Sequence, residues 1–293
     1  MRRQFVVTLE RLLEEDSRVV LLLGDIGVFG FRHSFAKFPM RTINIGILEQ
    51  ASISFAAGLA KEGFIPVFHS IAPFVVERAY EQLKDDFCYQ ALGGNFVSVG
   101  ASYDYAALGC THHCPADISL MKSLPSMQVA VPGHPHELDT LFIQAYANGC
   151  PTYFRLTERS NEEKRDVVFG KATVIQRGDA LTVIAVGPLL ETVVRAVGGL
   201  NLTILYYTTL SPFDGDTLAE NCASGKIVVV EPFYEGTLTN DIVASLQHRH
   251  VSITSIGVPH RFLTNYGIAE EHDIDCGLTS EAIRRKVEEC IHA

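Results

Sequence analysis

Short apolar runs alternate with mixed polar and apolar segments along the first half of the chain. Val19–Leu23, for example, is a run of five apolar residues that ends at Gly24 and Asp25. Such runs are typical of strands buried on both faces of a parallel sheet, and the segments between them suit crossover helices. The predicted strands are 19–23, 42–45, 65–68, 96–100 and 128–131, and the predicted helices are 10–15, 49–61 and 74–87.

A second series of the same kind fills the other half of the chain. Between the two series, residues 157–170 are polar and charged, which predicts a linker. We therefore expect an α/β fold of two doubly wound parallel-sheet domains, residues 1–156 and 171–293. The second series comprises predicted strands 181–186, 202–206, 227–230 and 251–256, and predicted helices 189–197, 240–247 and from 280 onward.

Composition and charge narrow the choice of partner. Hydrophobic residues make up 47% of the chain and charged residues 20%, which is ordinary for a globular α/β protein. A formal net charge of −10 argues against nucleic acid or an anionic membrane as the main partner. No apolar run reaches the roughly 18–20 residues of a membrane span, and no signal-peptide stretch follows the first arginines. We expect a cytoplasmic protein.

The seven cysteines are dispersed and odd in number, which indicates reduced thiols rather than a disulfide framework. One segment, Cys110-Thr111-His112-His113-Cys114, places four potential metal ligands within five residues. Zinc ligands are usually spaced so that a turn can wrap the ion, and adjacent histidines rarely both reach it. We therefore predict no metal site on this chain.

Polar residues that could do chemistry follow the predicted strands. Asp25 comes after the first strand, Glu49 after the second, His69 at the end of the third, and the loop 101–113 after the fourth. In open parallel sheets, ligand sites lie beyond the carboxyl ends of the strands. Glu49 enters its helix among apolar neighbours, where partial desolvation suits a carboxylate to proton exchange. From position alone, a helix-capping role for Glu49 is the simpler interpretation.

An ordered series of motifs changes that interpretation. The series resembles the pyrimidine-binding domain of the transketolase family, followed by the C-terminal domain of that family, and it covers nearly the whole chain. Each motif is weak alone, but their order is difficult to obtain by chance. The segments that carry the resemblance are 44–50, 55–60, 74–82, 111–121 and 124–133 for the first domain, and 208–214 and 229–231 for the second.

The resemblance implies thiamine diphosphate as cofactor and gives Glu49 a specific task. In this family a glutamate bonds the pyrimidine ring of the cofactor and favours the tautomer that generates the reactive carbanion. Phe74 matches the aromatic residue that stacks on the pyrimidine, although a core phenylalanine is the alternative interpretation of the residue itself. His112 matches a histidine near the substrate oxygens, where an imidazole can relay protons. Asp25 and Ile26 are implied at the cofactor.

The resemblance also implies substrate contacts, and here the sequence leaves choices open. His69 and His112 are expected to contact substrate, together with an arginine after the fifth strand. Both Arg155 and Arg159 are available for that arginine. We expect Arg155.

The diphosphate and magnesium motif of the family, Gly-Asp-Gly, is missing. Gly24-Asp25-Ile26-Gly27 lacks the tripeptide and lies in the part that resembles the pyrimidine domain. The resemblance thus implies a second subunit that carries the diphosphate and Mg²⁺, the two subunits forming a heterotetramer with a homodimeric contact. This chain would be the C-terminal subunit of a split transketolase-like enzyme.

Three further departures concern the substrate. Leu108 and Gly100 stand where transketolases carry an aspartate and a histidine, and Phe29 stands near an expected serine. We expect transfer of a two-carbon ketol unit from a ketose donor to an aldehyde acceptor, with a specialised sugar as substrate. The alternatives are the beta subunit of a 2-oxo-acid dehydrogenase, a relative of deoxyxylulose-phosphate synthase, and a regulatory subunit without turnover.

Overall fold

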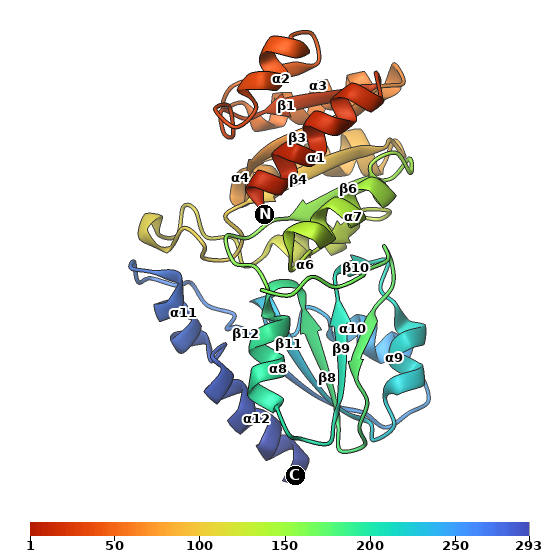
Figure 1. Ribbon diagram of the computed structural model, residues 1–293, viewed down its shortest axis with the longest axis vertical. Coiled ribbons are helices and arrows are strands. Elements are labelled where there is room, and N and C mark those ends of the chain that lie inside the picture. The colour runs from red at the N-terminus through yellow and green to blue at the C-terminus, as the bar shows by residue number, and fades with distance from the viewer. Residues whose placement is uncertain (293) are drawn as a thin grey trace.

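The computed structural model describes residues 1–292 and contains two β-sheets, one above the other along the long axis (Figure 1). The upper sheet has seven strands, and six of them are parallel. In sheet order these strands are β10 (Thr209–Ser211), β5 (Gln128–Ala130), β6 (Pro151–Arg155), β4 (Gly94–Val99), β3 (Ile65–Ile71), β1 (Val19–Leu23) and β2 (Thr42–Asn44).

Strand register aligns the carboxyl ends of the central strands of this sheet. Leu23 at the end of β1 lies beside Asn44 of β2 on one side and His69 of β3 on the other. Ile71 of β3 lies beside Val99 of β4. The loops after these strands therefore emerge along one edge, which is where a ligand site is expected in such a sheet.

Helices cover both faces of the upper sheet. On one face, α1 (Arg2–Glu15) packs against α7 (Pro135–Ala145), and Phe5 and Leu9 join a core with Leu21 and Leu23. The other face carries α3 (Glu49–Lys61), α4 (Ala72–Val76) and α6 (Asp117–Lys122). The remaining short elements around this sheet are α2 (Arg32–Lys37), α5 (Tyr80–Gln82), the π-helix η1 (Leu83–Cys88) and the 3₁₀ turn η2 (Ala106–Leu108).

The lower sheet has five strands, of which β7 alone runs antiparallel. Helices α8 and α12 pack together on one side, and α9 and α10 on the other. The elements of this half are β12 (Ser252–Val258), β11 (Lys226–Tyr234), β8 (Thr182–Val186), β9 (Thr203–Tyr207), β7 (Thr173–Gln176), η3 (Gly187–Leu189), α8 (Leu190–Val197), α9 (Gly215–Asn221), α10 (Thr239–Ser245), α11 (Ala269–Cys276) and α12 (Ser280–His292).

The α/β class and the two mostly parallel sheets are confirmed, with two additions that the sequence did not predict. Each sheet carries one antiparallel edge strand, β10 in the upper sheet and β7 in the lower. Strand β10 comes from the second half of the chain and pairs with β5, so the two halves share a sheet. Residues 156–172 form neither helix nor strand. The division at 157–170 remains a prediction.

The predicted helix 74–87 is wrong as a continuous element. It is divided into α4, a turn at 77–79, α5 and the π-helix η1. The turn places Arg78 beside the first residue of α3, where it makes an ion pair. Helices α2, α6, α7, α9 and α11 were not predicted. Among residues 1–292, no helix is long and apolar enough to cross a membrane.

Candidate active site

Glu49 is a buried carboxylate at the start of α3. It follows β2 after a short loop, and only 2% of its side chain is exposed. Arg78 Nη1 donates to both Glu49 oxygens, at 2.9 and 3.0 Å, while 41% of the Arg78 side chain remains exposed. The buried carboxylate is therefore bound by a guanidinium group that solvent can reach.

Phe74 and His112 extend this arrangement into one contiguous group. The Arg78 guanidinium carbon lies 4.1 Å from the centroid of the Phe74 ring, within the range of a cation–π contact. The His112 ring lies 5.4 Å from Phe74 at an interplanar angle of 68°. We call Glu49, Arg78, Phe74 and His112 the Glu49 cluster. Its members come from α3, the turn after α4, α4 itself and the loop after β4.

The loop after β4 also orients the His112 ring. Thr111 Oγ1 lies 3.0 Å from His112 Nδ1, so Nδ1 has a local partner and Nε2 is the nitrogen left to contact a ligand. The Tyr105 ring stands 6.5 Å from His112 at 70°. The other members of the five-residue segment point apart, because Cys110 is exposed while Cys114 is buried and donates from Sγ to Glu77 Oε1. Among residues 1–292, no group of three or more His, Cys, Asp or Glu side chains could hold a metal ion.

Asp25 lies at the same edge, in the loop after β1. Its φ of 56° is left-handed, a conformation that aspartate tolerates better than most residues. Asp25 and Asn44 exchange hydrogen bonds: the Asp25 amide donates to Asn44 Oδ1 at 3.1 Å, and Asn44 Nδ2 donates to Asp25 Oδ1 at 2.9 Å. Ile26 is half-buried against the core. The pair fixes the loop that the sequence assigned to cofactor binding.

His69 lies on the other face of the sheet from the Glu49 cluster. It is buried, donates from Nδ1 to the Val97 carbonyl at 2.9 Å and packs 4.9 Å from Phe5 of α1. Burial lowers the pKa of His69 to about 4, so the ring is neutral at physiological pH. Because it lies on the opposite face of the sheet, His69 does not contact Phe74 or Glu49. Instead it lines a cavity of about 150 Å³ together with Arg2 and Arg3.

Arg2 and Arg3 are a feature that sequence reasoning missed. In the sequence they were considered only in rejecting a signal peptide. They are the first residues of α1, whose first turn holds no acidic residue. Helices in this fold run antiparallel to their strands, so the positive end of α1 points to the same edge as the strand ends. The signal in the sequence was a pair of arginines opening an amphipathic helix that precedes the first strand.

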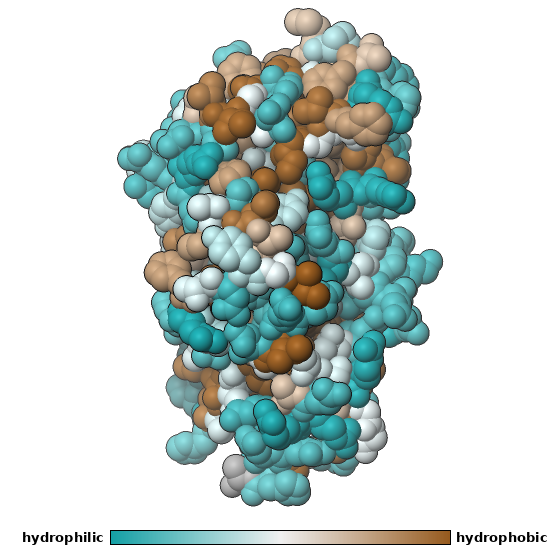
Figure 2. Space-filling view, turned by 90° about the vertical axis from the view of Figure 1, so that its left-hand side faces the viewer, coloured by the Kyte–Doolittle hydropathy of each residue, from teal (hydrophilic) through white to brown (hydrophobic). Residues whose placement is uncertain are grey.

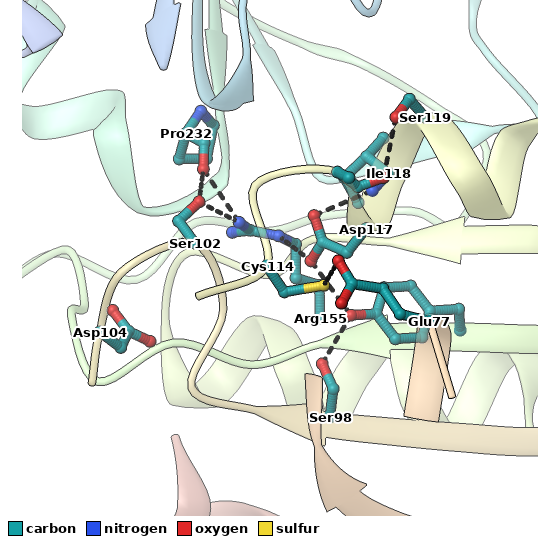
Figure 3. Close-up of polar contacts among 12 residues, drawn as sticks. Glu77, Ser98, Ser102, Asp104, Cys114, Asp117, Ile118, Ser119, Arg155 and Pro232 are labelled. Carbon is teal, nitrogen blue, oxygen red and sulfur yellow. Dashed lines mark hydrogen bonds and ion pairs between the residues drawn. The ribbon is translucent and has the colours of Figure 1, made fainter. Parts of the chain in front are cut away.

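Arg155 has no accessible atom with which to contact substrate, contrary to expectation. Its side chain is 0% exposed, and Nε donates to Asp117 Oδ2 at 2.7 Å (Figure 3). Nη2 donates to Ser102 Oγ at 2.6 Å and to the Pro232 carbonyl of β11 at 2.9 Å. Burial alone would lower the pKa of Arg155, but Asp117 against it raises the pKa above its usual value. Arg155 therefore links the two halves of the chain.

Arg159 is the accessible arginine of the two. Its side chain is 30% exposed, and Nη2 lies 2.6 Å from Asp273 Oδ2 of α11. It lines a cavity of about 480 Å³ between the loop 104–108 and the segment 267–270. Asp104 and Glu158 also line this cavity, and burial raises the pKa of Asp104 to about 6.

Exposed apolar side chains surround this edge of the upper sheet. Phe29 is 80% exposed, Ile47 63%, Leu48 62% and Leu108 52%. Figure 2 faces this side of the molecule and shows apolar groups gathered over its upper half. Exposed apolar side chains that gather on one face are typical of interaction sites.

The fold agrees with what comparison with known proteins finds. The family described as transketolase, pyrimidine binding domain, matches residues 1–163, and the chain belongs to that family. The chain is also 36% identical over 290 residues, 97% of its length and 92% of the relative, to an uncharacterized 33.6 kDa protein in the fasciation locus of Rhodococcoides fascians.

Two other likenesses concern proteins built from separate subunits. The chain is 28% identical to a subunit of the apulose-4-phosphate transketolase of Phocaeicola vulgatus, covering 92% of this chain and 94% of that one. A solved structure of a split gene transketolase, described as an inactive beta4 tetramer, superposes with a TM-score of 0.86 at 26% identity, covering 99% and 97% of the two chains. This chain is thus a C-terminal subunit of a split transketolase-like enzyme.

Proposed function

We propose that this chain is the subunit of a thiamine-diphosphate-dependent transketolase-like enzyme that activates the cofactor, with ketol transfer between a ketose donor and an aldehyde acceptor as the reaction. The observation that carries the proposal is the Glu49 cluster. A buried, ion-paired carboxylate, a half-buried aromatic ring and an imidazole lie together at an edge whose apolar surface is open.

The residues present fit the pyrimidine half of that cofactor. Glu49 offers a carboxylate oxygen to a ring nitrogen, Arg78 holds that carboxylate in place, and Phe74 offers an aromatic surface beside them. When bound, thiamine diphosphate supplies the carbanion chemistry. His112 then holds or moves a proton at a substrate oxygen through Nε2, because Nδ1 is engaged by Thr111. Asp25 and Ile26 hold the adjoining loop.

A partner subunit completes the site in this proposal. Exposed Phe29, Ile47 and Leu48 beside the cluster provide a surface for it, and the diphosphate and Mg²⁺ are bound by that partner. The relative from Phocaeicola vulgatus is named as one subunit of its enzyme, which supports a partner subunit, and the beta4 tetramer of the split-gene neighbour supports contacts between like subunits. The proposed assembly is a heterotetramer, and its proposed location is the cytoplasm.

The substrate is a specialised sugar rather than a common pentose phosphate. Apolar Leu108 lines the 480 Å³ cavity at a position where a hydroxyl would otherwise find a partner. Arg2 and Arg3 beside His69 provide a second place for an anionic group. The name of the apulose-4-phosphate relative supports a sugar outside the common set.

The test is reconstitution with the subunit that carries the Gly-Asp-Gly motif. We expect the isolated chain to bind thiamine diphosphate weakly in calorimetry with Mg²⁺ present, and the pair to bind it tightly and transfer ketol units. Tight stoichiometric binding by the isolated chain would contradict the split site. Decarboxylation of 2-oxo acids without ketol transfer would favour the dehydrogenase or synthase alternatives, and no turnover at all would favour a regulatory subunit.

A second assay addresses the substrate. Xylulose 5-phosphate and ribose 5-phosphate should be poor substrates of the reconstituted pair. A kcat/KM of about 10⁴ M⁻¹s⁻¹ or better with them, the lower end of the usual enzyme range, would show that the apolar positions do not restrict the sugar.

A further inference from the structure

Gly100, directly after β4, is a position where no other side chain fits. Its φ is +72°, and a Cβ built there would lie 2.4 Å from Tyr105 Cε2 and 2.6 Å from Cδ2. Real Cβ atoms do not come this close to an aromatic carbon. The Tyr105 ring therefore lies on the Gly100 backbone and fills the volume that a side chain at position 100 would take. A histidine at Gly100, the residue expected there from the resemblance, is excluded unless Tyr105 moves.

Tyr105 also forms one of two walls around His112. Its ring centroid is 6.5 Å from that of His112 at 70°, and the Phe74 centroid is 5.4 Å away at 68°. Both are edge-to-face arrangements within the favourable range for aromatic pairs. The imidazole packs beside both rings, and of these two rings only that of Tyr105 carries a polar atom.

Tyr105 also lines a cavity. It lines the 480 Å³ cavity together with Leu108 and Arg159. The cavity wall is acidic rather than basic, since Asp104 and Glu158 line it and Arg159 is paired with Asp273. Burial raises the pKa of Tyr105, so its phenol stays neutral and can donate a hydrogen bond.

We propose that Tyr105 is a positioning and specificity-determining residue of this site: its ring holds His112 against Phe74, and its hydroxyl meets an uncharged, hydroxyl-bearing part of the sugar substrate. The proposal rests on the proposed function and adds the substrate class. A neutral hydrogen-bond donor in an acidic cavity wall favours a hydroxyl over a phosphate on the part of the substrate that enters this cavity. In this proposal position 100 is glycine because the ring of Tyr105, five residues further along the loop, takes the space of a side chain there.

The experiment compares Tyr105→Phe and Tyr105→Ala in the reconstituted complex, with Tyr89→Phe as matched control because Tyr89 is 88% exposed. Tyr105→Phe keeps the ring and loses the hydroxyl, so we expect KM for a polyhydroxy substrate to rise about tenfold with kcat within about twofold of wild type. Tyr105→Ala removes the wall as well, so kcat should also fall about tenfold or more. The control should match wild type.

Two measurements keep this result separate from the fate of the proposed function. Hydrogen–deuterium exchange at the thiazolium carbon should be unchanged in all three variants, because Glu49 governs it and Tyr105 does not touch Glu49. In the isolated chain, the imidazole proton resonance of His112 should shift in Tyr105→Ala through loss of the ring current and stay near its wild-type position in Tyr105→Phe. An unmoved His112 resonance in Tyr105→Ala would overturn the proposal whether or not the complex is active.

A double substitution tests the contact with Gly100 itself. Gly100→Ala alone should disturb the Tyr105 ring and lower kcat as Tyr105→Ala does, because the added Cβ and the ring cannot share the space. In Gly100→Ala/Tyr105→Ala the two losses should not multiply, since the collision is gone. Losses that multiply independently would mean that Tyr105 does not occupy this volume in solution, and the proposal would fail.

Discussion

Two of the arginine–carboxylate pairs in the upper half of the molecule, Arg78–Glu49 and Arg155–Asp117, differ strongly in their exposure to solvent. Arg78 and Glu49 are 2.9 Å apart with the arginine 41% exposed, whereas Arg155 and Asp117 are 2.7 Å apart with both side chains 0% exposed. The first pair faces the open edge of the sheet. The second binds the Pro232 carbonyl and so ties the upper sheet to β11 of the lower one.

The difference shows that the solvent exposure of an ion pair indicates its role. A guanidinium that keeps contact with solvent can exchange partners, so the Arg78 pair can open a carboxylate to a ligand at small cost. A pair removed entirely from water has already lost its hydration, and breaking it leaves an uncompensated buried charge. The first pair is suited to function and the second to holding the fold.

The largest effect is expected at the accessible pair. Glu49→Gln removes the anion and keeps the shape, so exchange at the thiazolium carbon in the reconstituted complex should fall by about 10²–10⁴-fold or more, as for loss of a general acid–base group. Circular dichroism should show the fold retained. If the variant complex exchanges as fast as wild type, Glu49 only caps α3.

The buried pair should respond in stability instead. Asp117→Asn leaves the Arg155 charge buried without its partner, and we expect the free energy of unfolding to fall by about 3–5 kcal/mol in urea titrations. Lys286→Ala is the control, because Lys286 and Glu289 form a pair that is 49% and 56% exposed. That control should change stability by about 0.5 kcal/mol or less. Equal losses of unfolding free energy in Asp117→Asn and Lys286→Ala would show that burial does not make the Arg155–Asp117 pair important for stability.

A third carboxylate, Glu231 of β11, differs from both because it is buried without a paired cation among residues 1–292. The Gly236 amide donates to Oε1, while Oε2 has no partner among residues 1–292. Burial raises the pKa of Glu231 to about 8, so the folded state binds a proton that the unfolded state releases above its ordinary value near 4.5. Stability should therefore fall as pH rises from about 5 to about 8, on the order of a few kcal/mol.

Glu231→Gln is the matched variant for this pH dependence. It should flatten the slope measured by urea unfolding across that range, since a neutral amide does not titrate. A slope that persists in the variant would assign the pH dependence to other groups.

The smallest effect is expected when the accessible pair is weakened rather than broken. Lysine can donate to a carboxylate but lacks the flat guanidinium that also covers Phe74, so Arg78→Lys should reduce the thiazolium exchange rate about tenfold. The free energy of unfolding should change by less than about 1 kcal/mol, because the pair is part-exposed. Arg284→Lys in the surface helix α12 is the control. A large loss of stability in Arg78→Lys would mean that the Arg78–Glu49 pair stabilises the fold as the Arg155–Asp117 pair does.

The local sequence pattern was enough to predict most of the buried parallel strands, several helices and the order of polar residues at the strand ends. The apolar run 19–23 is β1, and the predicted helix 49–61 is α3 with the same bounds. Both follow from local patterns: a strand buried on both faces must be apolar throughout, and a glycine stops the helix at 63. The placement of Glu49 at a helix start beyond a strand follows from the same local rules.

Which of these residues come into contact depends on packing between distant segments of the chain. Arg155 and Arg159 are four residues apart, and nothing in their spacing shows that one is buried against Pro232 and the other faces a cavity. The break at 77–79, which brings Arg78 to Glu49, depends on a contact between segments 29 residues apart. The space over Gly100 is likewise filled by a ring that returns from later in the loop. Burial and contact depend on how distant segments pack, and a one-dimensional pattern records the polarity of a residue but not its neighbours.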